Sequence, residues 1–260
     1  MSDYVMGRTA EEYERLRRQA EVWAPATGRL LDRAGLSPGD RCLDVGCGTG
    51  AAMDLMTARG GVVTGIDVDA SLGAAVRGTF VAADVEKDDD AVPAGGFELV
   101  YGRLILLHVG DPAAVLRRMW RWVAPGGMLV VQDYDMRAVD GYPPSSLVDE
   151  WRRVFLGAYA AAGRDVGLGA RLPALFAEAG IGAPDGTDVT GRLGTMADSA
   201  GMLAATFRSI APLAIAQGLT TETKRDAWLS DIDTASRVYG DHSAMWPLLI
   251  GALKRKPAAV

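Results

Sequence analysis

Three acidic residues and a run of glycines in the first third of the chain could bind a small cofactor. The stretch Leu43-Asp44-Val45-Gly46-Cys47-Gly48-Thr49-Gly50 joins an apolar strand, predicted over 41–45, to a helix predicted over 50–59. Glycine has no Cβ, so a strand that turns through three glycines into a helix can bring backbone N–H groups close to a ligand. The stretch therefore predicts a nucleotide-cofactor loop.

The glycine spacing alone leaves the cofactor open. The pattern Gly46-x-Gly48-x-x-Ala51, followed by Asp67 after about twenty residues, also fits a dinucleotide-binding fingerprint. Asp44 precedes the first glycine, where its charge would repel a pyrophosphate but attract an ammonium or sulfonium group. Asp84 ends a later strand, predicted over 79–83, and adds a carboxylate at the same sheet edge. These acids suit a cationic cofactor better than an anionic one.

The glycine segment, Asp44-x-Gly46-x-Gly48-x-Gly50, resembles the first motif of the class I S-adenosylmethionine-dependent methyltransferases. Three later segments are similar to further motifs of that family, in order: Gly65-Ile66-Asp67-Val68-Asp69, Ala83-Asp84-Val85 and Ala124-Pro125-Gly126-Gly127-Met128-Leu129-Val130-Val131. The resemblance covers about residues 41–135. It implies S-adenosylmethionine as cofactor, with Asp67 on the ribose hydroxyls and Asp84 facing the adenine amino group.

The resemblance implies cofactor contacts from the glycine loop, the following strand ends and the N-terminal helices. The residues assigned in this way are Tyr4, Gln19, Gly46, Cys47, Gly48, Gly50, Asp67, Val68, Asp84, Val85 and Arg103. Tyr4 and Gln19 match positions in a small-molecule branch of the family, with surface or packing contacts as the alternative. Arg103 could pair with the cofactor carboxylate or an anionic substrate, or bridge to Asp133 or Asp135.

His108 and Asp133 are the candidate catalytic residues. Methyl transfer from a sulfonium is an in-line displacement, so positioning can supply much of the acceleration. A general base is needed where a carbon or oxygen acceptor must lose a proton, and His108 is then the first candidate and Asp133 the second. The alternatives are a histidine packed against the next helix and an acid that binds loop amides. A tertiary amine would need no base.

From residue 41 onward, predicted strands and helices alternate, which indicates parallel βαβ units. We therefore expect an α/β fold with a doubly wound, mostly parallel sheet, and the resemblance implies the seven-stranded, Rossmann-like methyltransferase form of it. One domain is expected, with a helical cover over 1–38, a core over 39–195 and 240–260, and a helical lid over 196–239.

The predicted helices of the cover and the lid are the parts that would close the site. The cover is expected to hold helices over 9–23 and 25–34, and the lid helices over 196–217 and 221–239. The lid carries apolar residues that would suit a hydrophobic acceptor or would simply dock the lid on the core: Met202, Phe207, Ile210, Leu213 and Trp228. A small, partly apolar acceptor is the expected substrate.

Composition excludes several other classes. The net charge of −6 and the pI near 5.0 argue against nucleic acid as a partner. No run of about eighteen consecutive apolar residues predicts a membrane span, and the polar start Met1-Ser2-Asp3 has no signal-peptide pattern, so we expect a cytoplasmic protein. Cys42 and Cys47 predict neither a disulfide nor a zinc site, and the acids of 86–90 are contiguous, as in a solvated loop, so no metal is expected.

Two other functions are compatible with the sequence. A nicotinamide-dependent oxidoreductase would share the glycine loop and Asp67 but leaves Asp84 and the turn Pro125-Gly126-Gly127 unexplained. A homologue that binds the cofactor without methyl transfer, such as a cyclase, would keep every motif. The sequence does not fix the oligomeric state, and a homodimer is one option.

Overall fold

The computed structural model describes residues 10–259, which fall into two compact units. The sheet unit comprises 16–133, 168–189 and 250–259, and the helical unit comprises 10–15, 134–167 and 190–249. The predicted lid segment 196–239 belongs to the helical unit, which also includes 134–167.

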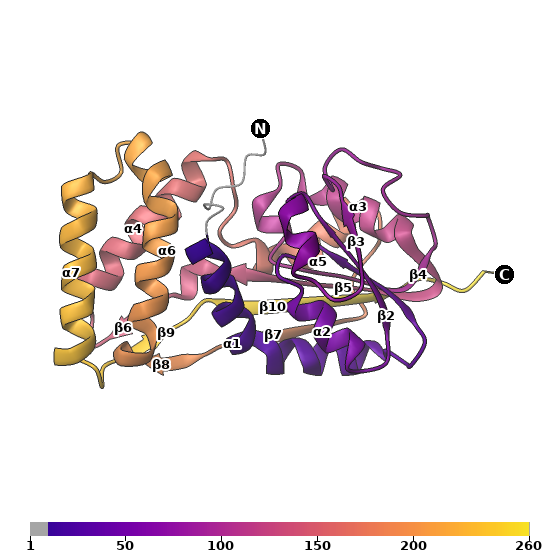
Figure 1. The fold of residues 1–260 in the computed structure, drawn as a ribbon, viewed down its shortest axis with the longest axis horizontal. Helices are drawn as coiled ribbons and strands as arrows, with labels where there is room; N and C mark the ends of the chain where they lie inside the picture. Colours follow the sequence, from indigo (N-terminus) through magenta and orange to yellow (C-terminus); the bar gives the residue numbers. More distant parts are fainter. Residues whose placement is uncertain (1–9, 260) are drawn as a thin grey trace. The chain divides into compact units, whose positions relative to one another are not determined.

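A seven-stranded sheet has the strand order β3-β2-β1-β4-β5-β10-β7 (Figure 1). Its strands are β1 (Arg41–Val45), β2 (Val62–Asp67), β3 (Thr79–Ala82), β4 (Phe97–Arg103), β5 (Val123–Asp135), β7 (Gly186–Thr190) and β10 (Leu248–Arg255). The pairs β1–β2, β1–β4, β2–β3 and β4–β5 are parallel. The predicted doubly wound, mostly parallel sheet is confirmed.

Helices cover both faces of the sheet (Figure 1), and most residues of its central strands β1, β4 and β5 are buried. Within residues 10–259, four helices start in the sheet unit or continue into it: α1 (Ala10–Ala34), α2 (Ala51–Thr57), α3 (Pro112–Trp122) and α5 (Leu168–Glu178). Tyr101 of β4 contacts Thr27 of α1. The next residue, Gly102, faces the other way, since a Cβ there would lie 2.9 Å from Met119 of α3.

The prediction of two helices over 9–23 and 25–34 is wrong, because α1 is a single helix that continues through Pro25. Proline lacks the N–H that would bond the carbonyl of Glu21, but it does not stop a helix whose face is buried on both sides of it. Trp23 before the proline and Leu30 after it are both buried. Burial therefore outweighs the missing hydrogen bond.

The helix expected over 70–77 is also wrong, because the chain forms a short 3-10 helix over Ala70–Ala74 instead. Its first turn is held by Asp69, whose carboxylate accepts a hydrogen bond from the amide of Ser71 at 3.0 Å. Gly73 and Gly78 interrupt the segment and weaken a longer helix.

Besides the first turns of α1, the described part of the helical unit contains three α-helices and a small antiparallel sheet. Helices α4 (Ser146–Ala161), α6 (Met196–Ala216) and α7 (Glu222–Val238) lie side by side (Figure 1). The sheet β6-β9-β8, formed by Asp140–Tyr142, Ser243–Met245 and Leu193–Thr195, was not predicted, because three-residue strands carry too little alternation to be recognised.

Helix α6 is long and apolar enough to cross a membrane by length and composition, with a mean hydropathy of 1.3. Buried core helices share these properties. Phe207, Ile210 and Ala214 of α6 are fully buried, and Phe207 stacks on Trp228 of α7 at 4.2 Å between ring centroids. Packing within the helical unit thus accounts for part of the apolar character of α6, of which 44% of the most apolar window is buried.

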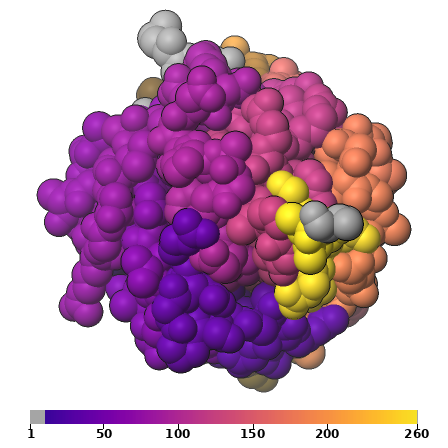
Figure 2. Space-filling view, turned by 90° about the vertical axis from the view of Figure 1, so that its right-hand side faces the viewer, coloured from indigo at the N-terminus to yellow at the C-terminus, as the bar shows by residue number. Residues whose placement is uncertain are grey.

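The C-terminal segment is fixed to the sheet unit beside the turn that begins β5. In Figure 2 this yellow segment lies against pink residues from the middle of the chain. The amide of Lys256 donates to the carbonyl of Gly127 at 2.8 Å, and its ammonium group donates to the carbonyls of Trp120 and Val123. Lys256 thereby caps the carbonyl end of α3.

Candidate functional site

The glycine loop is held to the end of strand β2. The amides of Gly46 and Cys47 both donate to the carbonyl of Ile66, at 2.8 and 3.0 Å. The amide of Gly48 donates to the Asp67 carboxylate at 2.9 Å. These N–H groups are therefore engaged within the protein, which corrects the expectation of bare loop amides facing a ligand. The hydrogen bond from Gly48 places the Asp67 carboxylate against the loop.

The three loop glycines all have positive φ, but they differ in what surrounds them. A Cβ at Gly46 would lie 2.8 Å from a methyl carbon of Ile105, whereas a Cβ at Gly48 would meet nothing within 4 Å. Gly50 caps the start of α2 in the left-handed conformation. Gly46 is thus needed for packing, while the space at Gly48 is open to a ligand.

Asp44 is a buried carboxylate with one oxygen that has no hydrogen-bond partner among residues 10–259. Burial raises the pKa of Asp44 to about 7, while the positive charge of Arg103 lowers it and the negative charge of Asp67 raises it. A buried acid with an unsatisfied oxygen is costly unless a cation or a donor joins it. Asp44 therefore fits a positively charged ligand group.

A buried polar cluster lies on the α1 face of the sheet. The hydroxyl groups of Thr27 and Tyr101 both donate to the side-chain carbonyl of Gln132, at 2.9 and 2.8 Å. Arg103 donates to the Thr27 hydroxyl at 3.1 Å. Arg103 is thus bonded to Thr27, which is neither of the two acids considered for a bridge, Asp133 and Asp135.

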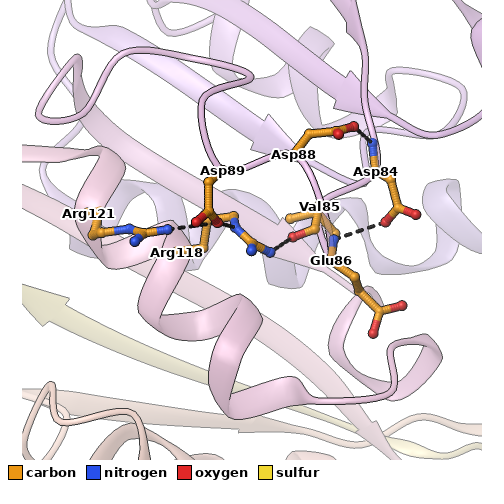
Figure 3. A network of polar contacts seen from close by, with 7 residues as sticks. All are labelled: Asp84, Val85, Glu86, Asp88, Asp89, Arg118 and Arg121. Atoms are coloured by element: carbon orange, nitrogen blue, oxygen red, sulfur yellow. Dashed lines mark hydrogen bonds and ion pairs between the residues drawn. The ribbon is translucent and has the colours of Figure 1, made fainter.

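Asp84 begins a compact turn after β3 (Figure 3). One carboxylate oxygen accepts a hydrogen bond from the amide of Glu86 at 2.9 Å. The other oxygen accepts one from the ammonium group of Lys87. Burial alone would raise the pKa of Asp84, but the hydrogen bonds from Lys87 and the Glu86 amide and the charges of Lys87 and Arg118 together hold that pKa below its usual range. Asp84 is a charged acceptor at neutral pH.

The charged loop over 86–90 is exposed, as expected, and it is also bonded to helix α3. Arg118 donates to Asp89 and to the carbonyl of Val85, and Arg121 donates to Asp89 at 2.9 Å (Figure 3). Glu86 accepts a hydrogen bond from the amide of Gly110 at 2.6 Å. These contacts fix the position of Asp84 and the buried Val85.

The remaining cofactor candidates differ in exposure. Val68 is exposed directly after Asp67. Cys47 is buried, and burial raises the pKa of its thiol. Both cysteines are free, as predicted. Gln19 is half-buried on α1, and Tyr4 lies outside the described residues.

His108 and Asp133 lie near the same short 3-10 helix, Leu106–His108. Asp133 is fully buried and accepts a hydrogen bond from the amide of Leu107 at 3.1 Å. Asp133 thus binds a loop amide, which is the structural role considered above as the alternative to a catalytic one. Leu104, two residues before this 3-10 helix, has φ +57, which is uncommon for a residue with a side chain. The backbone that leads to His108 is therefore held in a strained conformation.

Two cluster members, Thr27 and Gln132, were missed by sequence reasoning. Thr27 lies inside a helix without any motif, and its partner Gln132 is 105 positions away. The one signal in the sequence that could have pointed to Thr27 is its polar side chain within the apolar stripe of α1. Within residues 10–259, no group of three or more His, Cys, Asp or Glu side chains could hold a metal ion.

Comparison with known proteins matches residues 13–165 to a family model described as "Methyltransferase domain". A curated relative, phosphoethanolamine N-methyltransferase 3 of Arabidopsis thaliana, is 33% identical over 118 residues, which are 42% of this chain and 24% of that protein. The ubiquinone biosynthesis O-methyltransferase of Pseudomonas aeruginosa is 38% identical over 106 residues, 38% of this chain and 45% of that protein.

Among solved structures, the 4+2 cyclase SpnF has a similar fold, with a TM-score of 0.52 and 22% identity over 90% of this chain and 81% of that one. The chain therefore matches less than half of the length of these two curated relatives, while the fold similarity extends over most of the chain.

Proposed function

The chain belongs to the methyltransferase-domain family, and from that premise we propose that it transfers a methyl group from S-adenosylmethionine to a small, partly apolar molecule. The single observation that carries the proposal is the buried Asp44, whose unpartnered oxygen lies in the segment that matches the family's glycine motif. Family membership favours this activity over a nicotinamide-dependent oxidoreductase, which would bind an anionic pyrophosphate near the same acid.

The residues of the sheet unit fit this cofactor. Asp67 is oriented by Gly48 and Asp69, whose amides bond its two oxygens, and would hold the ribose hydroxyls. Asp84 remains ionised and would face the adenine amino group. Asp44 and Arg103 carry opposite charges and would bind the ammonium and carboxylate ends of the methionyl part. When bound, the cofactor supplies an electrophilic methyl group.

The chemistry left to the protein is positioning and, for some acceptors, removal of a proton. His108 is the proposed general base for an oxygen or carbon acceptor. Asp133 holds the amide of Leu107, next to His108, and so would position the histidine turn. The relatives act on an amine and on an oxygen, by their names, and the acceptor of this chain is proposed only as a small molecule.

Calorimetry with S-adenosylhomocysteine and NADP tests the cofactor. Binding of the first and not of the second supports the proposal, and the reverse result would overturn it. Methyl transfer is then tested by mass spectrometry, with cofactor carrying a deuterated methyl group and a library of small amines, phenols and carboxylic acids. A labelled product supports a methyltransferase. Tight cofactor binding with unlabelled, rearranged product would support the cyclase alternative.

A further inference from the structure

Asp44 and Arg103 lie on neighbouring strands of the sheet, and the positive charge of Arg103 lowers the pKa of Asp44. The strand register pairs Asp44 with Tyr101 and Arg103 with Gln132. Side chains at paired positions, and at every second position along a strand, point to the same face of a sheet. Asp44, Tyr101, Arg103 and Gln132 therefore share one face, and Thr27 of α1 bonds three of them.

Thr27 is the residue that joins this cluster to Arg103. Its hydroxyl has one hydrogen, which it donates to Gln132, and it accepts one from Arg103. Thr27, Tyr101 and Gln132 are each fully buried. Because the Gln132 carbonyl accepts from both Thr27 and Tyr101, the Thr27 hydroxyl is fixed in orientation, and the guanidinium bonded to it is fixed as well.

We propose that Thr27 is a positioning residue of the cofactor site, which holds the Arg103 guanidinium on the Asp44 face of the sheet, where its positive charge favours the ionised carboxylate that a cationic ligand would bind. The part that concerns the ligand rests on the proposed function. The link between Thr27 and the charge of Asp44 does not, because it is a property of the unliganded sheet unit.

Among residues 10–259, the ionisable groups that act on Asp44 or are acted on by it belong to the sheet unit. Arg103 lowers the pKa of Asp44 and Asp67 raises it. Burial raises the pKa of Tyr101 to about 12, and the thiol pKa values of Cys42 and Cys47 are also raised by burial, so these groups stay neutral near pH 7. Arg103 is thus the one of these groups that opposes the burial of the Asp44 charge.

The direct test is a titration of Asp44 in unliganded protein, by NMR of ¹³C-labelled carboxyl groups, with Asp44→Asn used for assignment. Thr27→Val keeps the shape of the side chain but removes the hydroxyl, and should raise the Asp44 midpoint by about 0.5–1 pH unit. Thr27→Ser should restore the wild-type midpoint. Arg103→Gln should raise it at least as far as Thr27→Val.

Thr206→Val is the matched control, because Thr206 is also a buried helix threonine whose hydroxyl bonds a large neighbour, Trp151, at 3.1 Å. It should leave the Asp44 midpoint unchanged. A Thr27→Val midpoint equal to that of the wild type, or a smaller shift in Arg103→Gln than in Thr27→Val, would overturn the proposal.

The second readout is the affinity for S-adenosylhomocysteine between pH 6 and pH 9. A shift of 0.5–1 unit would weaken binding by Thr27→Val about two- to five-fold at pH 7 and leave it close to wild type at pH 9. A loss of equal size at every pH would indicate general structural damage and would contradict the positioning role. If the wild type itself fails to bind at any pH, the proposed function fails, while the Asp44 titration still decides the role of Thr27.

Discussion

The Asp67 carboxylate accepts a hydrogen bond from the amide of Gly48 at 2.9 Å, so the acid at the end of β2 and the middle of the glycine loop form one structural piece. The other Asp67 oxygen accepts from the amide of Asp69 at 3.0 Å. An acid held at both oxygens loses little conformational freedom when a ligand arrives, which favours tight binding.

We expect Asp67→Ala to weaken binding of S-adenosylhomocysteine by about 1–3 kcal/mol, the range for ligand hydroxyls left without their acceptor. Isothermal titration calorimetry measures the change. Asp90→Ala, which removes an exposed acid from the loop after β3, is the control and should bind like the wild type. Unchanged affinity in Asp67→Ala would remove Asp67 from the site.

Asp44 should make the stability of the unliganded protein depend on pH. Its folded pKa is about 7 against an ordinary value of 3.8. Between these values the folded state keeps a proton that the unfolded state has released, so the free energy of unfolding falls as the pH rises from about 4 to about 7. Asp44→Asn carries no charge and should escape this loss.

Urea unfolding at pH 5 and at pH 8 measures the effect. The difference in stability between Asp44→Asn and the wild type should shift in favour of the variant at pH 8, while its affinity for S-adenosylhomocysteine falls. A difference that is the same at both pH values would contradict a raised Asp44 pKa.

Alanine at Gly46 and at Gly48 should separate packing from ligand binding. Both positions have positive φ, which costs a residue with a side chain about 1–2 kcal/mol. Gly46→Ala adds a clash with Ile105 and should lower the melting temperature further than Gly48→Ala does. Gly48→Ala should affect mainly the affinity for S-adenosylhomocysteine. Equal melting temperatures for the two variants would contradict this division.

Asp133 should prove structural in a stability measurement. Asp133→Ala strands the buried amide of Leu107 and should reduce the free energy of unfolding by about 1–3 kcal/mol. Asp133→Asn keeps an acceptor oxygen and should lose less. If Asp133 acted only as a catalytic base, both variants would retain wild-type stability in chemical unfolding and differ from it only in methyl transfer.

The sheet unit could largely be predicted because its signals are local. Strand β1 and the glycine loop lie in one continuous segment. Strand β2 ends at Asp67, and strand β3 ends two residues before Asp84. The roles of side chains depend on distant partners. No spacing in the sequence relates Thr27 to Gln132, and the loop amides could be assigned to Ile66 and Asp67 only from the paired strands.

Pro25 divides helix α1 into two parts that can respond separately to heat or denaturant. Pro25 has no N–H to donate to the carbonyl of Glu21, so α1 lacks one backbone hydrogen bond two residues before Thr27. The turns before Pro25 can therefore unwind without releasing Thr27 from Gln132. In amide hydrogen exchange, residues 10–22 should lose their protection earlier than residues 28–34. The amides of the strand residues around Arg103 should stay protected after those of residues 10–22 have exchanged.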